Sequence, residues 1–227
     1  GFSPDETRGL VTSNETGIYN LFEINFADGS KKQLTFSETE SLFGIGYVHD
    51  TGQVLYSADK GGNENNHIYL LNEDGTSTDL TPGDNVKASF SGFSRDKKTM
   101  YLTSNKRDPR FFDLYKMNVG DWKEEMLWEN KEGLDYAGAS KDRSLIATVK
   151  SITTSESKLF IINLSTGETV EVSEPDKPGV YSASGFTNDN TAFFYTTDAG
   201  KEFTYLVKYT MATGKRELLY EANWDVT

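Results

Sequence analysis

The stretch Gly92-Phe93-Ser94-Arg95-Asp96, followed directly by Lys97-Lys98-Thr99-Met100-Tyr101-Leu102, has the pattern of a strand end, a polar turn and a second strand. The pattern occurs five times, and the separations of its turn aspartate are 45, 46, 46 and 47 residues. A glycine precedes each aspartate by four residues. A fixed period of this length is typical of repeat architectures. The aspartates are Asp5, Asp50, Asp96, Asp142 and Asp189, and the glycines are Gly1, Gly46, Gly92, Gly138 and Gly185.

A second glycine turn repeats with nearly the same period. It follows aromatic and aliphatic runs such as Leu114-Tyr115-Lys116-Met117-Asn118, and its separations are 46, 45, 47 and 47 residues. Each period therefore holds about four strands, and a unit of roughly 40–45 residues with four strands is a propeller blade. The chain of 227 residues is predicted to be one all-β domain, residues 1–227, with five four-stranded blades. The second glycines are Gly29, Gly75, Gly120, Gly167 and Gly214.

The third blade illustrates the expected elements. Its strands are predicted over Val86–Ser94, Thr99–Ser104, Phe112–Asn118 and Glu124–Trp128. Phe93 and its equivalent Phe186 are expected to be buried between neighbouring blades. The glycine that precedes them is expected to leave room where inner strands crowd around the propeller axis.

The ends of the chain fall inside inner strands of the repeat. Gly1 to Asp5 is expected to form only the tail of an inner strand, and Thr227 falls a few residues before the repeated glycine position. Unpaired strand edges are a liability for a folded protein. We therefore favour a closed ring over an open arc from a larger propeller.

Composition restricts the classes of partner. The net charge of −12 opposes binding to phosphate backbones and anionic lipid, so no nucleic-acid or membrane partner is expected. No apolar run approaches the ~18 residues of a membrane span. The absence of cysteine excludes disulfides and thiolate metal sites. A cytoplasmic location is expected, and a periplasmic one stays open because Gly1 is not an initiator methionine.

No catalytic motif is visible. The sequence contains no G-x-S-x-G nucleophile elbow, no P-loop and no H-E-x-x-H motif. The two histidines, His49 and His67, occupy a turn position and the start of a strand, and neither is expected to be a base held by a carboxylate toward a nucleophile. The chain alone is therefore predicted to be inactive, without catalytic residues, bound metal or cofactor.

A cationic loop is the candidate binding site. It runs from Asn105 to Phe111 and holds Arg107 and Arg110 beside aromatic residues and a proline. Two guanidinium groups on a rigid loop suit the recognition of a carboxylate of a substrate or partner. The alternative is that Asp108 and Asp113 pair with these arginines at the surface.

The repeat resembles that of TolB-type propellers. The resemblance rests on Gly92-Phe93-Ser94-Arg95-Asp96, on the Leu114–Asn118 run and on endings such as Asp79-Leu80-Thr81-Pro82. More specifically, the chain is similar to the N-terminal propeller of prolyl oligopeptidase-family serine peptidases, in the acylaminoacyl-peptidase-like branch. That family places its catalytic triad on an α/β-hydrolase domain that this chain lacks, and its propellers usually have seven or eight blades.

The resemblance implies a non-catalytic propeller that gates or positions peptide substrates for a serine peptidase. The implied partners are a peptide, a protein, or a hydrolase domain outside this chain. Two alternatives stay open, namely a TolB-like protein–protein interaction module and a five-bladed glycosidase. A glycosidase needs two carboxyl groups about 5–9.5 Å apart. Its candidate acids near the inner strands are Glu38, Glu40, Asp84 and Asp135.

Overall fold

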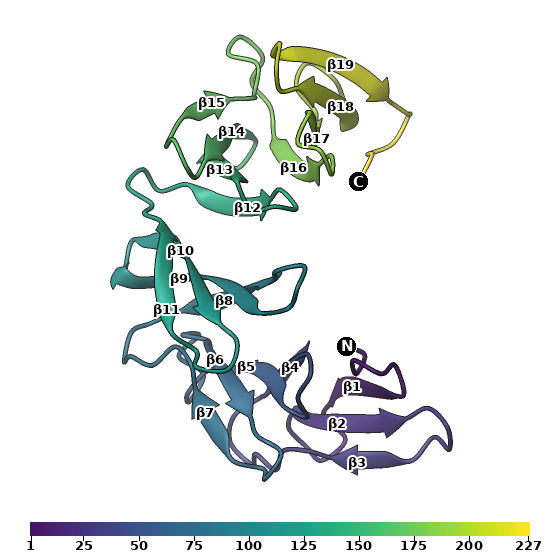
Figure 1. Cartoon of the computed structure of the whole chain (residues 1–227). Helices are drawn as coiled ribbons and strands as arrows, with labels where there is room; N and C mark the ends of the chain where they lie inside the picture. The colour runs from purple at the N-terminus through teal and green to yellow at the C-terminus, as the bar shows by residue number, and fades with distance from the viewer. The chain divides into compact units, whose positions relative to one another are not determined.

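The computed structural model describes every residue from Gly1 to Thr227 and contains nineteen strands (Figure 1). Consecutive strands pair antiparallel, and they form five separate sheets in chain order. The chain has two compact units, Gly1–Met126 and Leu127–Thr227. It forms no helix that is long and apolar enough to cross a membrane. The predicted all-β class and the five repeated sheets are confirmed, and the single-domain organisation stays a prediction.

The first unit holds the first three blades, and its boundary with the second unit falls within β11. The first blade consists of β1 (Arg8–Ser13), β2 (Asn20–Asn25) and β3 (Lys31–Gln33). The second consists of β4 (Phe43–Tyr47), β5 (Val54–Ala58), β6 (His67–Leu71) and β7 (Ser77–Asp79). The third consists of β8 (Ala88–Phe93), β9 (Thr99–Asp108), β10 (Phe111–Asn118) and β11 (Glu124–Trp128).

The second unit holds the fourth and fifth blades. The fourth consists of β12 (Asp135–Ala139), β13 (Leu145–Thr153), β14 (Glu156–Asn163) and β15 (Thr169–Glu171). The fifth consists of β16 (Tyr181–Phe186), β17 (Ala192–Thr197), β18 (Tyr205–Thr210) and β19 (Lys215–Tyr220).

The first blade has three strands, which corrects the expectation of four in every blade. Its inner strand is represented only by the bridge between Phe2 and Gly9 and by the bond from the Leu10 nitrogen to the Gly1 oxygen, 2.7 Å long. The strand tail expected at Gly1 to Asp5 is therefore confirmed for Gly1 and Phe2, which pair with β1.

The core of the first unit lies between neighbouring blades, because β5 buries both of its faces. Side chains alternate across a strand. Val54 and Tyr56 therefore pack with Leu10 of the first blade, whereas Leu55 packs with Leu102 of the third. In the second unit the same type of cluster joins the fourth blade to the fifth, for example through Leu159, Phe193 and Tyr195.

Phe93 and Phe186 are only partly buried, which corrects the expectation of full burial. Phe93 packs against the cluster between the second and third blades, and Phe186 packs against the cluster of the second unit. Both are the last residues of their inner strands, so their rings lie at the edge of the core.

The repeated turn is held by a side-chain network. The Ser94 hydroxyl donates to Asp96 Oδ1 at 2.6 Å and accepts from the Thr99 nitrogen at 3.0 Å. Asp96 Oδ1 also accepts from the Lys98 nitrogen at 3.2 Å. Because the serine and aspartate together satisfy the turn backbone, they recur in the repeat. The first, fourth and fifth blades form the equivalent bonds through the pairs Ser3 and Asp5, Ser140 and Asp142, and Thr187 and Asp189.

Two of the glycines that lie four residues before the aspartates have a different role from the one expected. At Gly138 and Gly185 an added Cβ would meet no atom within 4 Å, so crowding does not select glycine there. Both have positive φ, 137° and 145°, and both lie at β-bulges of the inner strand. Only glycine adopts this backbone region without strain, so the backbone at these two bulges requires it.

Candidate functional site

The two histidines lie in different parts of the second blade. His67 is buried, and its Nδ1 lies 2.7 Å from Asp79 Oδ2. No hydroxyl is hydrogen-bonded to its other ring nitrogen, so a Ser-His-Asp arrangement lacks its nucleophile. His49 is half-exposed and contacts its neighbour Asp50 at 2.9 Å. The His67–Asp79 pair ties the start of β6 to β7.

The acids considered for a glycosidase come from separate places. Glu38, Glu40 and Asp84 lie in connections between blades, and Asp135 begins β12. No hydrogen bond joins any two of them. The structure also contains no cluster of three histidines, aspartates or glutamates that could hold a metal ion. Nothing in the structure favours the glycosidase alternative over the other two.

The cationic loop is the tip of the long β9–β10 hairpin. Antiparallel pairing places this hairpin at the end of the blade opposite to the Asp96 turn. β9 continues to Asp108, beyond the Ser104 end that the sequence predicts, because polar side chains on the hairpin pair with one another. Arg107 lies on this extension, and Arg110 lies in the turn that joins β9 to β10.

The two arginines have different surroundings. Arg107 makes two bonds to Asp113, 2.7 and 2.8 Å long, and the Asp113 side chain is fully buried. Arg110 makes two bonds to Asp108, 3.0 and 2.7 Å long, but its side chain is 73% exposed. Hydrogen bonds from Arg110 lower the pKa of Asp108 to about 2. Of the two, Arg110 is the more exposed and therefore the more accessible to a ligand.

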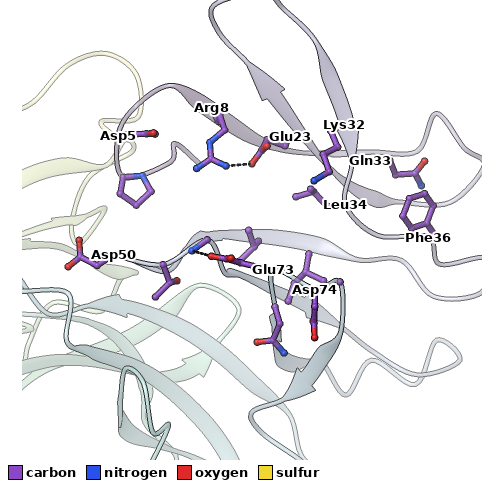
Figure 2. Close-up of a pocket in the computed structure, with 17 residues that line it drawn as sticks. Asp5, Arg8, Glu23, Lys32, Gln33, Leu34, Phe36, Asp50, Glu73 and Asp74 are labelled. Atoms are coloured by element: carbon purple, nitrogen blue, oxygen red, sulfur yellow. Dashed lines mark hydrogen bonds and ion pairs between the residues drawn. The ribbon is translucent and has the colours of Figure 1, made fainter.

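A groove between the first and second blades was not foreseen from the sequence (Figure 2). Its volume is about 870 Å³, and we call it the blade 1–2 groove. One wall comes from the Asp5 turn and from β2 and β3, and the other comes from the turns around Asp50 and Asp74. Its lining includes Asp5, Arg8, Glu23, Lys32, Leu34, Phe36, Asp50, Val54, Leu71, Glu73 and Asp74.

Hydrogen bonds order the walls of this groove. Arg8 pairs with Glu23 at 3.1 Å, and Glu23 also accepts from the Tyr47 hydroxyl at 2.9 Å. On the facing wall Glu73 Oε1 accepts from the Gly52 nitrogen at 2.9 Å (Figure 2). A Cβ added to Gly52 would lie 2.2 Å from that oxygen, so glycine permits the contact. These bonds hold both walls of the groove in place.

The repeat itself contains the signal that could have located the groove. Asp5 and Asp50 occupy the same repeat position in neighbouring blades, and both line the groove. In each blade, the turn that follows the inner strand and the turn that precedes the outer strand lie at the same end. Where two consecutive blades pack together, these turns of both blades therefore lie close to one another.

Comparison with known proteins supports the sequence resemblance. The structure of TolB from Acinetobacter baumannii matches 95% of this chain and 52% of its own, with a TM-score of 0.55 and 19% identity. The fold is that of the TolB-like propellers. A structure from a study of two prolyl endopeptidases matches 98% of this chain and 36% of its own, with a TM-score of 0.68 and 14% identity. The predicted similarity to both groups of propellers is confirmed.

One curated protein is similar in sequence. Dipeptidyl aminopeptidase BIII of Pseudoxanthomonas mexicana is 26% identical over 179 residues, which cover 77% of this chain. The matched segment covers 26% of that enzyme, so the chain spans about a quarter of its relative. No protein-family model matches the chain.

Proposed function

We propose that this chain is the non-catalytic propeller part of a serine peptidase, where it gates or positions peptide substrates. The observation that supports this most directly is the alignment of 77% of the chain with a dipeptidyl aminopeptidase. The chain lacks a nucleophile elbow, so the chemical step belongs to a hydrolase domain outside it.

The physical role of such a propeller is selection by size and orientation. Antiparallel blades with cores between them form rigid walls, and a rigid wall beside an active site admits an extended peptide and excludes a folded protein. Orientation before reaction lowers the entropic part of the barrier. Both effects require a stable blade and no catalytic group on it.

Arg110 is the residue that we assign to substrate positioning, with Arg107 as its support. The exposed guanidinium group of Arg110 suits a carboxylate of a bound peptide. In the intact enzyme, Arg110→Ala should raise KM for peptides that have a free carboxylate and leave kcat unchanged. Blocked peptides of the same sequence are the control, and an unchanged KM for both would leave Arg110 as a surface ion pair only.

The test of the function uses the complete reading frame that contains this chain. Its product should include a G-x-S-x-G segment and cleave short peptidyl p-nitroanilides, and it should leave folded proteins intact. The chain of residues 1–227 alone should cleave neither peptides nor p-nitrophenyl esters. A reading frame without a hydrolase segment, or turnover by the purified chain that a serine-directed phosphonate abolishes, would overturn the proposal.

A TolB-like interaction module is the second candidate, because TolB matches nearly the whole chain. This function needs no hydrolase domain. It predicts that the product of the complete reading frame binds a protein partner stably and has no peptidase activity. Affinity capture from the native cell extract, followed by identification of the partner and reconstitution from purified components, distinguishes the two candidates.

We also propose that the two units close into one five-bladed ring. The free edge of β1 pairs only with Gly1, Phe2 and Ser3, so the rest of this edge could pair with residues that follow β19. The chain has no cysteine, so a disulfide in the double variant Phe2→Cys with Asp225→Cys would report that these two positions are close, without interference from other thiols. Rapid disulfide formation within the monomer supports closure. Formation only between molecules, or none, would indicate an open arc.

A further inference from the structure

We propose that the blade 1–2 groove binds an extended peptide segment in which lysine or arginine side chains flank an apolar residue. This inference concerns the isolated chain, because the groove is made by the first unit alone. It therefore holds whether or not a hydrolase domain completes the protein.

The first argument is the charge of the lining. Five carboxylates and two cationic side chains line the groove, a net formal charge of −3. Arg8 is already paired with Glu23. The other four carboxylates have no lysine or arginine partner in the structure, and Lys32 is the one remaining cation. These four are Asp5, Asp50, Glu73 and Asp74.

The second argument is that three of these carboxylates are held in place through one oxygen each. Glu73 Oε1 accepts from the Gly52 nitrogen, as described above. Asp74 Oδ1 accepts from the Thr76 nitrogen at 2.9 Å and from its hydroxyl at 2.6 Å. Asp5 Oδ1 accepts from the Ser3 hydroxyl at 2.6 Å. The second oxygen of each group makes no hydrogen bond, so it is positioned to accept one from a cationic ligand.

The third argument is the apolar floor between these carboxylates. Val54 and Leu71 are buried at the base of the groove, and Leu34 lies partly buried beside them. Phe36 is at the rim with 76% of its surface exposed. An apolar side chain inserted here would cover the floor while its cationic neighbours reach the rim. A small inorganic cation would leave this floor uncovered.

A second cavity adjoins the groove, which favours an extended ligand. This second cavity of about 300 Å³ shares Pro4 with the groove and is lined by Phe2, Tyr47, His49 and Phe93. The first cavity has a mainly acidic lining, and the second adds the aromatic side chains of Phe2, Tyr47 and Phe93. An extended peptide could contact both cavities, whereas a compact ligand could not.

The test measures binding of a fluorescent peptide with alternating cationic and leucine residues to the purified chain, by anisotropy. An acidic peptide of the same length is the ligand control. The key variant is Glu73→Gln with Asp74→Asn, which keeps the hydrogen-bonding carbonyl oxygens and so the turn. Its affinity for the cationic peptide should fall about five- to tenfold. The affinity of the unaltered chain should also fall as salt rises.

A matched variant separates a local site from the general negative charge. Glu132→Gln with Asp176→Asn removes the same charge from exposed positions in the second unit, and it should change the affinity by less than about twofold. Thermal unfolding checks that all variants are folded. Equal weakening by both double variants would overturn the proposal, as would absence of peptide binding. Stronger binding of spermine than of the peptide would also overturn it, because the apolar floor would then contribute nothing.

Discussion

Arg107 and Asp113 form a two-bond ion pair across the β9–β10 hairpin, and the carboxylate is fully buried while the guanidinium side chain is 29% exposed. Asp113 also accepts a bond from the Tyr115 hydroxyl at 3.2 Å. The pair was expected at the surface, if it formed at all. Its burial makes it part of the structure that supports Arg110.

Removal of Arg107 should destabilise the protein. Arg107→Ala leaves a buried carboxylate without its cation, and we expect a loss of about 3 kcal/mol in the free energy of unfolding. Chemical denaturation measures this loss. Arg110→Ala is the matched control, and it should leave the denaturation midpoint nearly unchanged because the Arg110 pair is screened by solvent. Equal effects of the two substitutions would contradict the assignment of Arg107 as structural.

The turn aspartates predict an acid-sensitive stability. Hydrogen bonds from Ser3 lower the pKa of Asp5 to about 2, those from Thr187 lower the pKa of Asp189 to about 2, and Ser94 lowers the pKa of Asp96. The ordinary aspartate value is about 3.9. Since the folded pKa is the lower one, these groups stabilise the fold above about pH 4. That contribution is lost as the pH falls toward about 2.

A single substitution isolates one of these turns. Ser94→Ala removes the donor to Asp96, so the variant should lose less stability between about pH 4 and pH 2 than the unaltered protein does. Urea denaturation at both pH values measures the difference. Parallel pH dependence of the two proteins would show that this hydrogen bond does not contribute to acid sensitivity.

The positive φ angles of the bulge glycines predict that alanine at these positions destabilises the protein. Gly185→Ala places a side chain at φ 145° and should cost about 1–3 kcal/mol. Gly46→Ala is the control at the same repeat position, because Gly46 has no positive φ and an added Cβ meets no atom within 4 Å. Thermal unfolding compares the two. If Gly46→Ala is as costly as Gly185→Ala, crowding near the inner strands is the cause after all.

The burial of two side chains predicts which of two core substitutions costs more stability. Leu102 has no exposed surface and lies between the second and third blades, so Leu102→Ala should cost about 2–5 kcal/mol. Phe93 is partly exposed at the end of β8, and Phe93→Ala should cost less than Leu102→Ala despite removing more atoms. Equilibrium denaturation gives both values. The reverse order would mean that the ring of Phe93 is more deeply packed than the structure shows.

The sequence by itself determined the repeat, the strand order and the turns. These features depend on bonds between near neighbours, such as that from Ser94 to Asp96, and on apolar runs along strands such as β5. Local features of this kind recur with the repeat period, so they can be recognised in the amino-acid sequence. Strand ends in the long hairpins were less well predicted, because polar pairs continue the pairing beyond the apolar pattern.

The tertiary structure alone decided which side chains meet. Glu73 and Asp5 line one groove although they belong to different repeats, because packing of sheet faces brings turns of neighbouring blades together. It also decided that Asp113 is buried beneath Arg107, and that Gly138 and Gly185 serve a bulge rather than a crowded contact. Burial and backbone dihedral angles depend on how strands pair and twist, and a residue's identity leaves several such outcomes open.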